Sequence, residues 1–212
     1  MDGKNLLLNT LTTRDFARWL LLHEYVHNSG PLPLFNQNAN KFSKKRYGFI
    51  EELRVDLTTI KIIIDNIKSG VLSAEFYNVI AIIIIERLFR ASIYNFRQNW
   101  PNDTGMFSNE VEGDTAIALM IILANFKVFD PSKKILNIDI TGITQLAELI
   151  LSDVYKYEHL ANEKNRFNGT CDIFAKFLKD KYFKMAPDVH DFLVCNSVQD
   201  CHYELNFVGK NE

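Results

Sequence analysis

Apolar side chains recur along most of this chain at intervals of three and four residues, the spacing that keeps them on one face of a helix. Polar segments and Gly or Pro residues separate these periodic stretches. A β-prone segment at residues 135–140 is the exception. We therefore expect a mainly α, multi-helix protein with at most one short strand. The predicted helices cover about residues 12–28, 46–68, 73–99, 114–129, 143–164 and 170–185.

The ends of the first two predicted helices carry clear signals. Thr12 and Asp15 have the spacing of a capping box, in which each side chain accepts the backbone N–H of the other residue. Gly30 and Pro31 predict the end of the first helix, because Gly readily adopts the left-handed conformation of a C-cap and Pro cannot continue a helix. Gly70 predicts the end of the second helix in the same way.

Composition narrows the class of protein. The 212 residues are 47% hydrophobic and 24% charged, which is typical of a folded globular chain. A formal net charge of -2 provides no basic surface for a phosphate backbone, so we expect no nucleic-acid partner. The most apolar runs, 79–85 and 116–124, are shorter than the roughly 20 residues of a membrane-spanning helix, so we expect no membrane partner. Three scattered cysteines and the lack of a signal-peptide pattern predict a cytoplasmic protein.

The strongest chemical signal is the segment His23-Glu24-Tyr25-Val26-His27, an H-E-x-x-H motif inside the first predicted helix. Side chains four residues apart lie on one helical face, so both imidazoles can reach one metal ion. Glu24 lies one step around the helix, where a carboxylate can take a proton from metal-bound water. The alternative is an ordinary helix with two hydrogen-bonded histidines and no metal.

A second motif, Glu51-Glu52-Leu53-Arg54-Val55-Asp56, lies in the second predicted helix. Glu52 can complete a three-ligand set with the two histidines, because the intervening turn and loop let this helix fold back on the first. Asp56, four residues later on the same face, is placed to accept the N–H of a ligand histidine. The alternative to a metal site is a solvated acidic patch near the start of the helix, where acidic side chains interact favourably with the helix dipole. The order and spacing of the two motifs together favour a metal site.

The two motifs resemble those of the gluzincin metallopeptidases, and the second most closely resembles the E-E-x-R-x-D/E motif of the dipeptidyl-peptidase III family. The resemblance implies a zinc exopeptidase with a helical, metal-bearing lobe. It also implies a role for each residue that matches the two motifs. These residues are His23, His27 and Glu52 as ligands of one Zn²⁺ ion, Glu24 as general base, and Glu51 and Asp56 as acids that support the ligands.

The resemblance covers residues 12–67, and two features depart from the family pattern. The first motif lacks the extra residue of the H-E-x-x-G-H form that is typical of dipeptidyl-peptidase III. Only 22 residues precede His23, where gluzincins have a substantial lobe. We expect a helical, zincin-like catalytic half at 1–129 with a helical extension at 130–212 packed on it, or a single domain over 1–212. Either arrangement fits the C-terminal part of a larger ancestral protein.

A metallopeptidase also needs an electrophile that stabilises the oxyanion of the transition state. Arg87 and Tyr94 are predicted for this role, and Arg90 shares their face of the third predicted helix. The alternative for these residues is a solvated, charged face of a long helix. We expect His159 to be a surface residue.

The sequence thus predicts a zinc-dependent hydrolase that cleaves a peptide or related small amide, with Glu24 moving the proton. Two alternatives stay open, namely a catalytically inactive zinc-binding domain with a structural or regulatory role and a metal-free helical interaction module. A distance above about 5 Å between Glu52 and both imidazoles would exclude direct ligation, because zinc–ligand bonds are near 2 Å. The sequence predicts neither the substrate's identity nor the oligomeric state.

Overall fold

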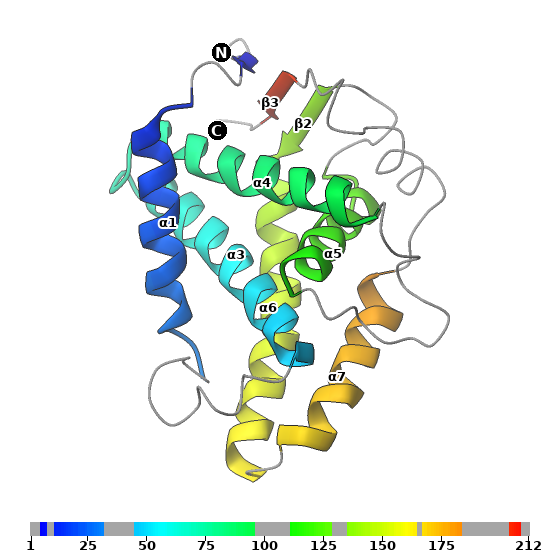
Figure 1. The fold of residues 1–212 in the computed structure, drawn as a ribbon. Helices are drawn as coiled ribbons and strands as arrows, with labels where there is room; N and C mark the ends of the chain where they lie inside the picture. Colours follow the sequence, from blue (N-terminus) through cyan, green and yellow to red (C-terminus); the bar gives the residue numbers. More distant parts are fainter. Residues whose placement is uncertain are drawn as a thin grey trace.

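The computed structural model describes residues 5–7, 11–31, 45–95, 111–128, 135–164, 167–183 and 204–208. These residues form a mainly α fold, as the sequence predicts, in which helices pack against one another and a small sheet lies at one end (Figure 1). The helices are α1 (Thr13–His27), α3 (Lys45–Lys68), α4 (Tyr77–Asn95), α5 (Val111–Asn125), α6 (Ile140–Lys164) and α7 (Phe167–Tyr182), with a 3-10 turn η2 (Ala74–Phe76) before α4.

Helix α1 begins where the capping box predicts. The Thr12 side-chain oxygen accepts the N–H of Asp15 at 3.2 Å, and the Asp15 carboxylate accepts the N–H of Thr12 at 3.1 Å. The chain leaves α1 through Gly30 at a φ of 90°, and Gly70 follows α3 at a φ of 76°. Both glycines therefore adopt the left-handed conformation that a side chain would disfavour. The predicted start of α1 and the predicted ends of α1 and α3 are confirmed.

Other helix boundaries differ from the prediction by a few residues. Helix α6 begins at Ile140 rather than near residue 143, because Asp139 Oδ1 accepts the N–H of Thr141 at 2.9 Å and caps the helix. Helix α5 ends at Asn125 rather than near residue 129, and the chain turns there through Lys127 at a φ of 57°. Helix α7 begins at Phe167 rather than near residue 170, so the Asn-Gly pair at 168–169 lies inside α7.

Within the described residues, the sheet has three short strands in the order β1-β3-β2. Strand β3 (Glu204–Val208) pairs in the antiparallel sense with β1 (Asn5–Leu7) and in the parallel sense with β2 (Ile135–Asp139). Strand β2 is the predicted one, but the expectation of at most one strand is corrected to three. Strands β1 and β3 come from opposite ends of the chain, and their pairing depends on tertiary contacts that a local sequence pattern does not show.

Helix α3 runs through the middle of the helical layer and packs on each of the other described helices (Figure 1). Apolar side chains along its length are therefore buried, including Phe49, Leu53 and Ile60. Helices α4 and α5 are apolar around most of their circumference, as expected for enclosed helices. Among the described helices, none combines the length and the apolar composition that crossing a membrane would require.

The predicted division at residues 129–130 lies outside the described residues. One hydrophobic cluster draws side chains from both sides of this position, such as Leu53 and Leu119 before it and Ile150 after it. Helix α6 packs on α3, so the segment after residue 130 helps to bury the helix that carries the second motif.

Candidate metal centre

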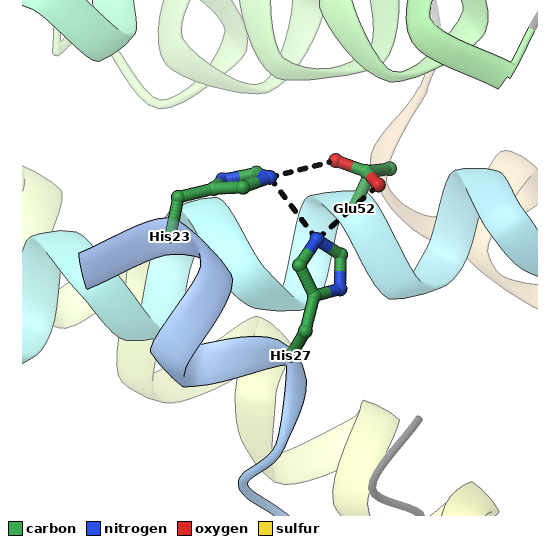
Figure 2. A group of neighbouring side chains, drawn as sticks. All are labelled: His23, His27 and Glu52. Carbon is green, nitrogen blue, oxygen red and sulfur yellow. Dashed lines mark hydrogen bonds and ion pairs between the residues drawn. The ribbon is translucent and has the colours of Figure 1, made fainter. Parts of the chain in front are cut away.

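The H-E-x-x-H motif lies in the last turns of α1, and its two histidines lie on the buried face of that helix. Trp19, His23, Val26 and His27 share this face, and α1 packs on α3 and α4. The period of an α-helix places residues four apart beside each other, so the imidazoles of His23 and His27 are neighbours. Glu52 projects from α3 toward them (Figure 2).

Three side-chain atoms converge between α1 and α3 (Figure 2). The His23 Nε2 lies 3.1 Å from the His27 Nε2 and 3.3 Å from the Glu52 Oε2, and the His27 Nε2 lies 3.5 Å from the Glu52 Oε1. The ligand atoms of a tetrahedral zinc ion, with bonds of about 2.0–2.1 Å, lie about 3.3 Å apart. Each Nε2 is thus about one ligand-to-ligand distance from an oxygen of Glu52, and one ligand atom from each of the three residues lies within 4.8 Å of the other two, so the condition for direct ligation by Glu52 is met.

A carboxylate of α3 lies behind each imidazole. The Glu51 Oε1 lies 2.9 Å from the His27 Nδ1, and the Asp56 Oδ1 lies 3.4 Å from the His23 Nδ1. Because an ionised carboxylate only accepts hydrogen bonds, the tautomer with a proton on each Nδ1 would suit these neighbours. In that tautomer each Nε2 would present a lone pair to a metal ion at the common point, as metal-binding histidines commonly do.

The two carboxylates that face His23 raise the proton affinity of its imidazole. Burial alone would lower the pKa of this imidazole, but the Asp56 and Glu52 carboxylates raise the pKa to about 10. At neutral pH the metal-free site therefore holds a proton on His23, in the space that a cation would occupy. Burial would raise the pKa of Glu52, whereas His23, His27 and Arg87 together hold that pKa below its usual value.

Arg87, predicted as an electrophile, lies beside the ligand set. Its Nε donates to the Asp56 Oδ2 at 2.6 Å, its Nη2 donates to the Glu52 Oε2 at 3.3 Å, and its Nη1 donates to Glu112. The residue is only 2% exposed. Burial would lower the pKa of Arg87, but Asp56, Glu86 and Glu112 hold it above its usual value, so the guanidinium stays charged. Its donors face carboxylates.

Arg54, to which the two motifs assign no role, connects α3 to α6 and to the turn that follows α1. Its Nη1 donates to the Ser29 carbonyl just after α1 at 2.9 Å, and its Nε lies 3.0 Å from the Glu158 Oε1 on α6. Its Nη2 lies 3.8 Å from the Glu51 Oε1 that faces His27. The signal was available in the motif, because Arg54 stands between the apolar Leu53 and Val55, and a buried charge needs a partner.

The remaining predicted residues lie at three different places. Glu24 is exposed on α1, one residue beyond His23. Arg90 is partly exposed on α4 and pairs with Glu86 and Glu112. Tyr94 belongs to α4, but its side chain lies outside the described residues. His159 is exposed on α6, as the sequence predicts.

No protein-family model, curated protein sequence or solved structure matches this chain. Its class is therefore defined by its own fold and site, as a mainly α protein with a His-His-Glu group that can hold a metal ion. The likeness to gluzincin metallopeptidases rests on the two sequence motifs.

Proposed function

We propose that this protein binds one Zn²⁺ ion through His23, His27 and Glu52 and uses it to hydrolyse a peptide or a related small amide. The observation that carries the proposal is that one ligand atom each from His23, His27 and Glu52 lie within 4.8 Å of one another. Two imidazoles and one carboxylate form a ligand set known from catalytic zinc sites. A further position on the ion then stays open for water or substrate.

The charges around the ligands also suit a divalent cation. Glu51, Glu52 and Asp56 place three carboxylates against the two imidazoles. The buried guanidinium groups that pair with these carboxylates are those of Arg54 and Arg87. Negative charge therefore exceeds positive charge when both imidazoles are neutral, and burial makes such an excess costly. A bound cation, or a proton on His23, offsets it.

Each residue of the site has a defined part in the proposed reaction. Zinc, when bound, supplies a water of lowered pKa and polarises the scissile carbonyl. Asp56 and Glu51 hold the imidazoles in the tautomer that ligates. Glu24, next to His23 and open to solvent, accepts the proton of the attacking water and returns it to the leaving amine. The peptide substrate and the cytoplasmic location expected from the sequence belong to this proposal.

A zinc site with a structural role is the second candidate, and burial favours it. His23 and His27 are each only 7% exposed, and the side chain of Glu52 is 13% exposed. Structural zinc sites are commonly closed to solvent, whereas catalytic sites keep a position open to substrate. The two candidates share the metal and differ in the consequence of changing Glu24.

The first test is the metal content of the purified chain, measured by elemental mass spectrometry. We expect about one zinc per chain, lost in His23→Ala because one of three protein ligands is removed. His159→Ala is the matched control, because His159 is an exposed histidine away from the site. Absence of bound metal after zinc is supplied would contradict the proposal and favour the metal-free module.

The second test separates catalysis from structure. We expect Glu24→Gln to keep its zinc and to reduce cleavage of dipeptide amides by at least about 100-fold, since general-base catalysis contributes about 10²–10⁴-fold. Glu148→Gln, which changes an exposed acid on α6, should leave the rate unchanged. Zinc binding without cleavage across a peptide library would favour the structural role. Cleavage that survives Glu24→Gln would show that Glu24 is not the base.

A further inference from the structure

We propose that Arg87 is a positioning residue that holds the His23 imidazole in place for metal binding. It acts through two carboxylate oxygens that the guanidinium and the imidazole share, one from Glu52 and one from Asp56. This inference rests on the proposed metal function and deepens it, because it assigns a support to one of the ligands. It also gives Arg87 a role different from that of an electrophile.

A single nitrogen of Arg87 contacts both shared oxygens. The Arg87 Nη2 donates to the Glu52 Oε2 at 3.3 Å and to the Asp56 Oδ1, also at 3.3 Å. The same Glu52 Oε2 lies 3.3 Å from the His23 Nε2, and the same Asp56 Oδ1 lies 3.4 Å from the His23 Nδ1. The two carboxylates therefore bridge the guanidinium and the imidazole, with one carboxylate at each nitrogen of the ring.

The orientation of Asp56 depends on Arg87. The Arg87 Nε donates to the Asp56 Oδ2 at 2.6 Å, so the guanidinium contacts both oxygens of this carboxylate. Such a bidentate contact fixes the plane of the carboxylate as well as its position. Asp56 is 0% exposed, and a buried carboxylate is costly unless it is paired. Arg87 thus determines where the acceptor for the His23 Nδ1 lies, and a hydrogen bond at that nitrogen orients a ligand imidazole.

The other ligand histidine has a support of its own. The His27 Nδ1 lies 2.9 Å from the Glu51 Oε1, and that oxygen lies 3.8 Å from the Arg54 Nη2. Each imidazole therefore has a carboxylate behind its Nδ1 and an arginine beside that carboxylate. Loss of the Arg87 contacts is expected to disturb the Nδ1 of His23 and to spare the Nδ1 of His27.

Burial separates this role from that of an electrophile. Arg87 is 2% exposed, and its Nε, Nη1 and Nη2 each donate to a carboxylate. An electrophile must turn a donor toward the substrate oxyanion. The three nitrogens of Arg87 instead face Asp56, Glu52 and Glu112, so the residue acts through these acids.

Positioning and charge predict opposite effects of Arg87 on zinc binding. A guanidinium beside a cation site repels the cation, so its charge alone would weaken zinc binding. Positioning of a ligand strengthens zinc binding. Arg87→Lys keeps the positive charge but loses the planar fork of N–H groups, so this variant isolates the positioning effect. Arg87→Met removes the charge and the fork together.

The test compares Arg87→Lys and Arg87→Met with Arg90→Met in the full chain. Arg90 is a matched control, because it lies one turn further along α4 and pairs with Glu86 and Glu112. Zinc affinity is measured by competition with a chelator. Nitrogen NMR of the zinc-loaded protein follows the Nδ1 signal of each ligand histidine. Circular dichroism checks that each variant is folded.

We expect Arg87→Lys to weaken zinc binding by about 10- to 100-fold, the range found when residues that orient metal ligands are changed. The Nδ1 signal of His23 should shift, whereas that of His27 should keep its position because Glu51 still faces it. Arg87→Met should show the same shift with a smaller loss of affinity, because a repelling charge is removed as well. Arg90→Met should resemble the unmodified protein in both measurements.

The inference is overturned if folded Arg87→Lys keeps the zinc affinity of the unmodified protein, or if the two Nδ1 signals shift alike. In the first case the arginine acts through its charge, and in the second it acts on the fold as a whole. Should Arg87→Lys fail to fold, Arg87→Met decides the question. Weaker zinc binding by that variant supports the inference, and unchanged or tighter binding overturns it.

Failure of the proposed function has a different signature. In that case the unmodified protein itself binds no zinc, and the positioning role of Arg87 falls with it. Zinc binding without peptide cleavage would remove the catalytic proposal alone, since the affinity and the NMR signals test the positioning role without any turnover.

Discussion

His23 owes its properties to charged neighbours on three helices. Asp56 and Glu52 face it from α3, His27 lies beside it on α1, and Arg87 of α4 pairs with both acids. Burial disfavours the charged imidazole, but the two carboxylates outweigh burial and raise the pKa of His23 to about 10. The proton and a metal ion therefore compete for the same nitrogen, Nε2.

This competition predicts a pH dependence of opposite sign for stability and for zinc binding. The folded-state pKa of His23 lies above the ordinary value of 6.5, so the protonated imidazole stabilises the metal-free protein fully below about pH 6.5. That stabilisation is lost as pH rises toward about 10, whereas zinc binding strengthens because less proton must be displaced.

Denaturant unfolding in the presence of a chelator, repeated across this pH range, measures the stability. Chelator competition over the same range measures the zinc affinity. Asp56→Asn is the comparison variant, because removal of one carboxylate lowers the pKa of His23 and shifts both curves to lower pH. A zinc affinity that is independent of pH between 6.5 and 8 would contradict the expectation.

The turn after α1 connects the geometry of one element to the site. Gly30 has a φ of 90°, and a Cβ added there would lie 3.1 Å from the Arg54 Nη1. That nitrogen also donates to the Ser29 carbonyl, so the turn and the arginine are packed together. Arg54 in turn lies beside Glu51, which bonds the imidazole of His27. A substitution in this turn is therefore expected to alter the positions of the metal ligands.

A comparison of Gly30 with Gly70 distinguishes the cost of backbone strain from the cost of crowding against Arg54. Gly70 has a similar positive φ of 76°, but a Cβ there would meet nothing within 4 Å. We expect Gly70→Ala to lower the free energy of unfolding by about 1 kcal/mol through strain alone. Gly30→Ala should cost more than Gly70→Ala and also weaken zinc binding, because Arg54 must shift. Equal losses in denaturant unfolding, with zinc affinity unchanged in both variants, would show that the Gly30 turn is independent of the site.

Across the whole molecule, the helices that carry and support the site are joined by charged pairs as well as by apolar packing. Arg54 of α3 and Glu158 of α6 form a pair at 3.0 Å, and both side chains are 0% exposed. Lys61 and Glu148 join the same two helices at 3.2 Å, with side chains 32% and 55% exposed. Two ion pairs between the same elements thus differ mainly in burial.

We expect Glu158→Gln to lower the free energy of unfolding by about 3–5 kcal/mol, because it removes the charge opposite a buried guanidinium. Glu148→Gln should change it by less than about 1 kcal/mol, because water screens an exposed pair. Denaturant unfolding of both variants at the same pH provides the comparison. A similar small effect in both would show that the buried pair does not hold α3 and α6 together.

Much of the fold was predictable from local patterns in the sequence. The capping box at Thr12 and Asp15 placed the start of α1, and Gly30 and Gly70 placed the ends of α1 and α3, because these signals act within a few residues. The start of α6 was predicted three residues late, because the role of Asp139 as a cap follows from its position at the end of β2. Strands β1 and β3 had no local signal strong enough to predict them.

The candidate site, like the fold, was predictable from the sequence only where local patterns determine it. The sequence by itself determined that His23 and His27 share one helical face, and that Glu52 and Asp56 share another, because the period of a helix is a local property. Only the tertiary structure decided that these faces meet, that Arg87 joins Glu52 to Asp56, and that Arg54 reaches Glu158. Those contacts join residues that are distant in the chain, and they depend on how whole helices pack around α3.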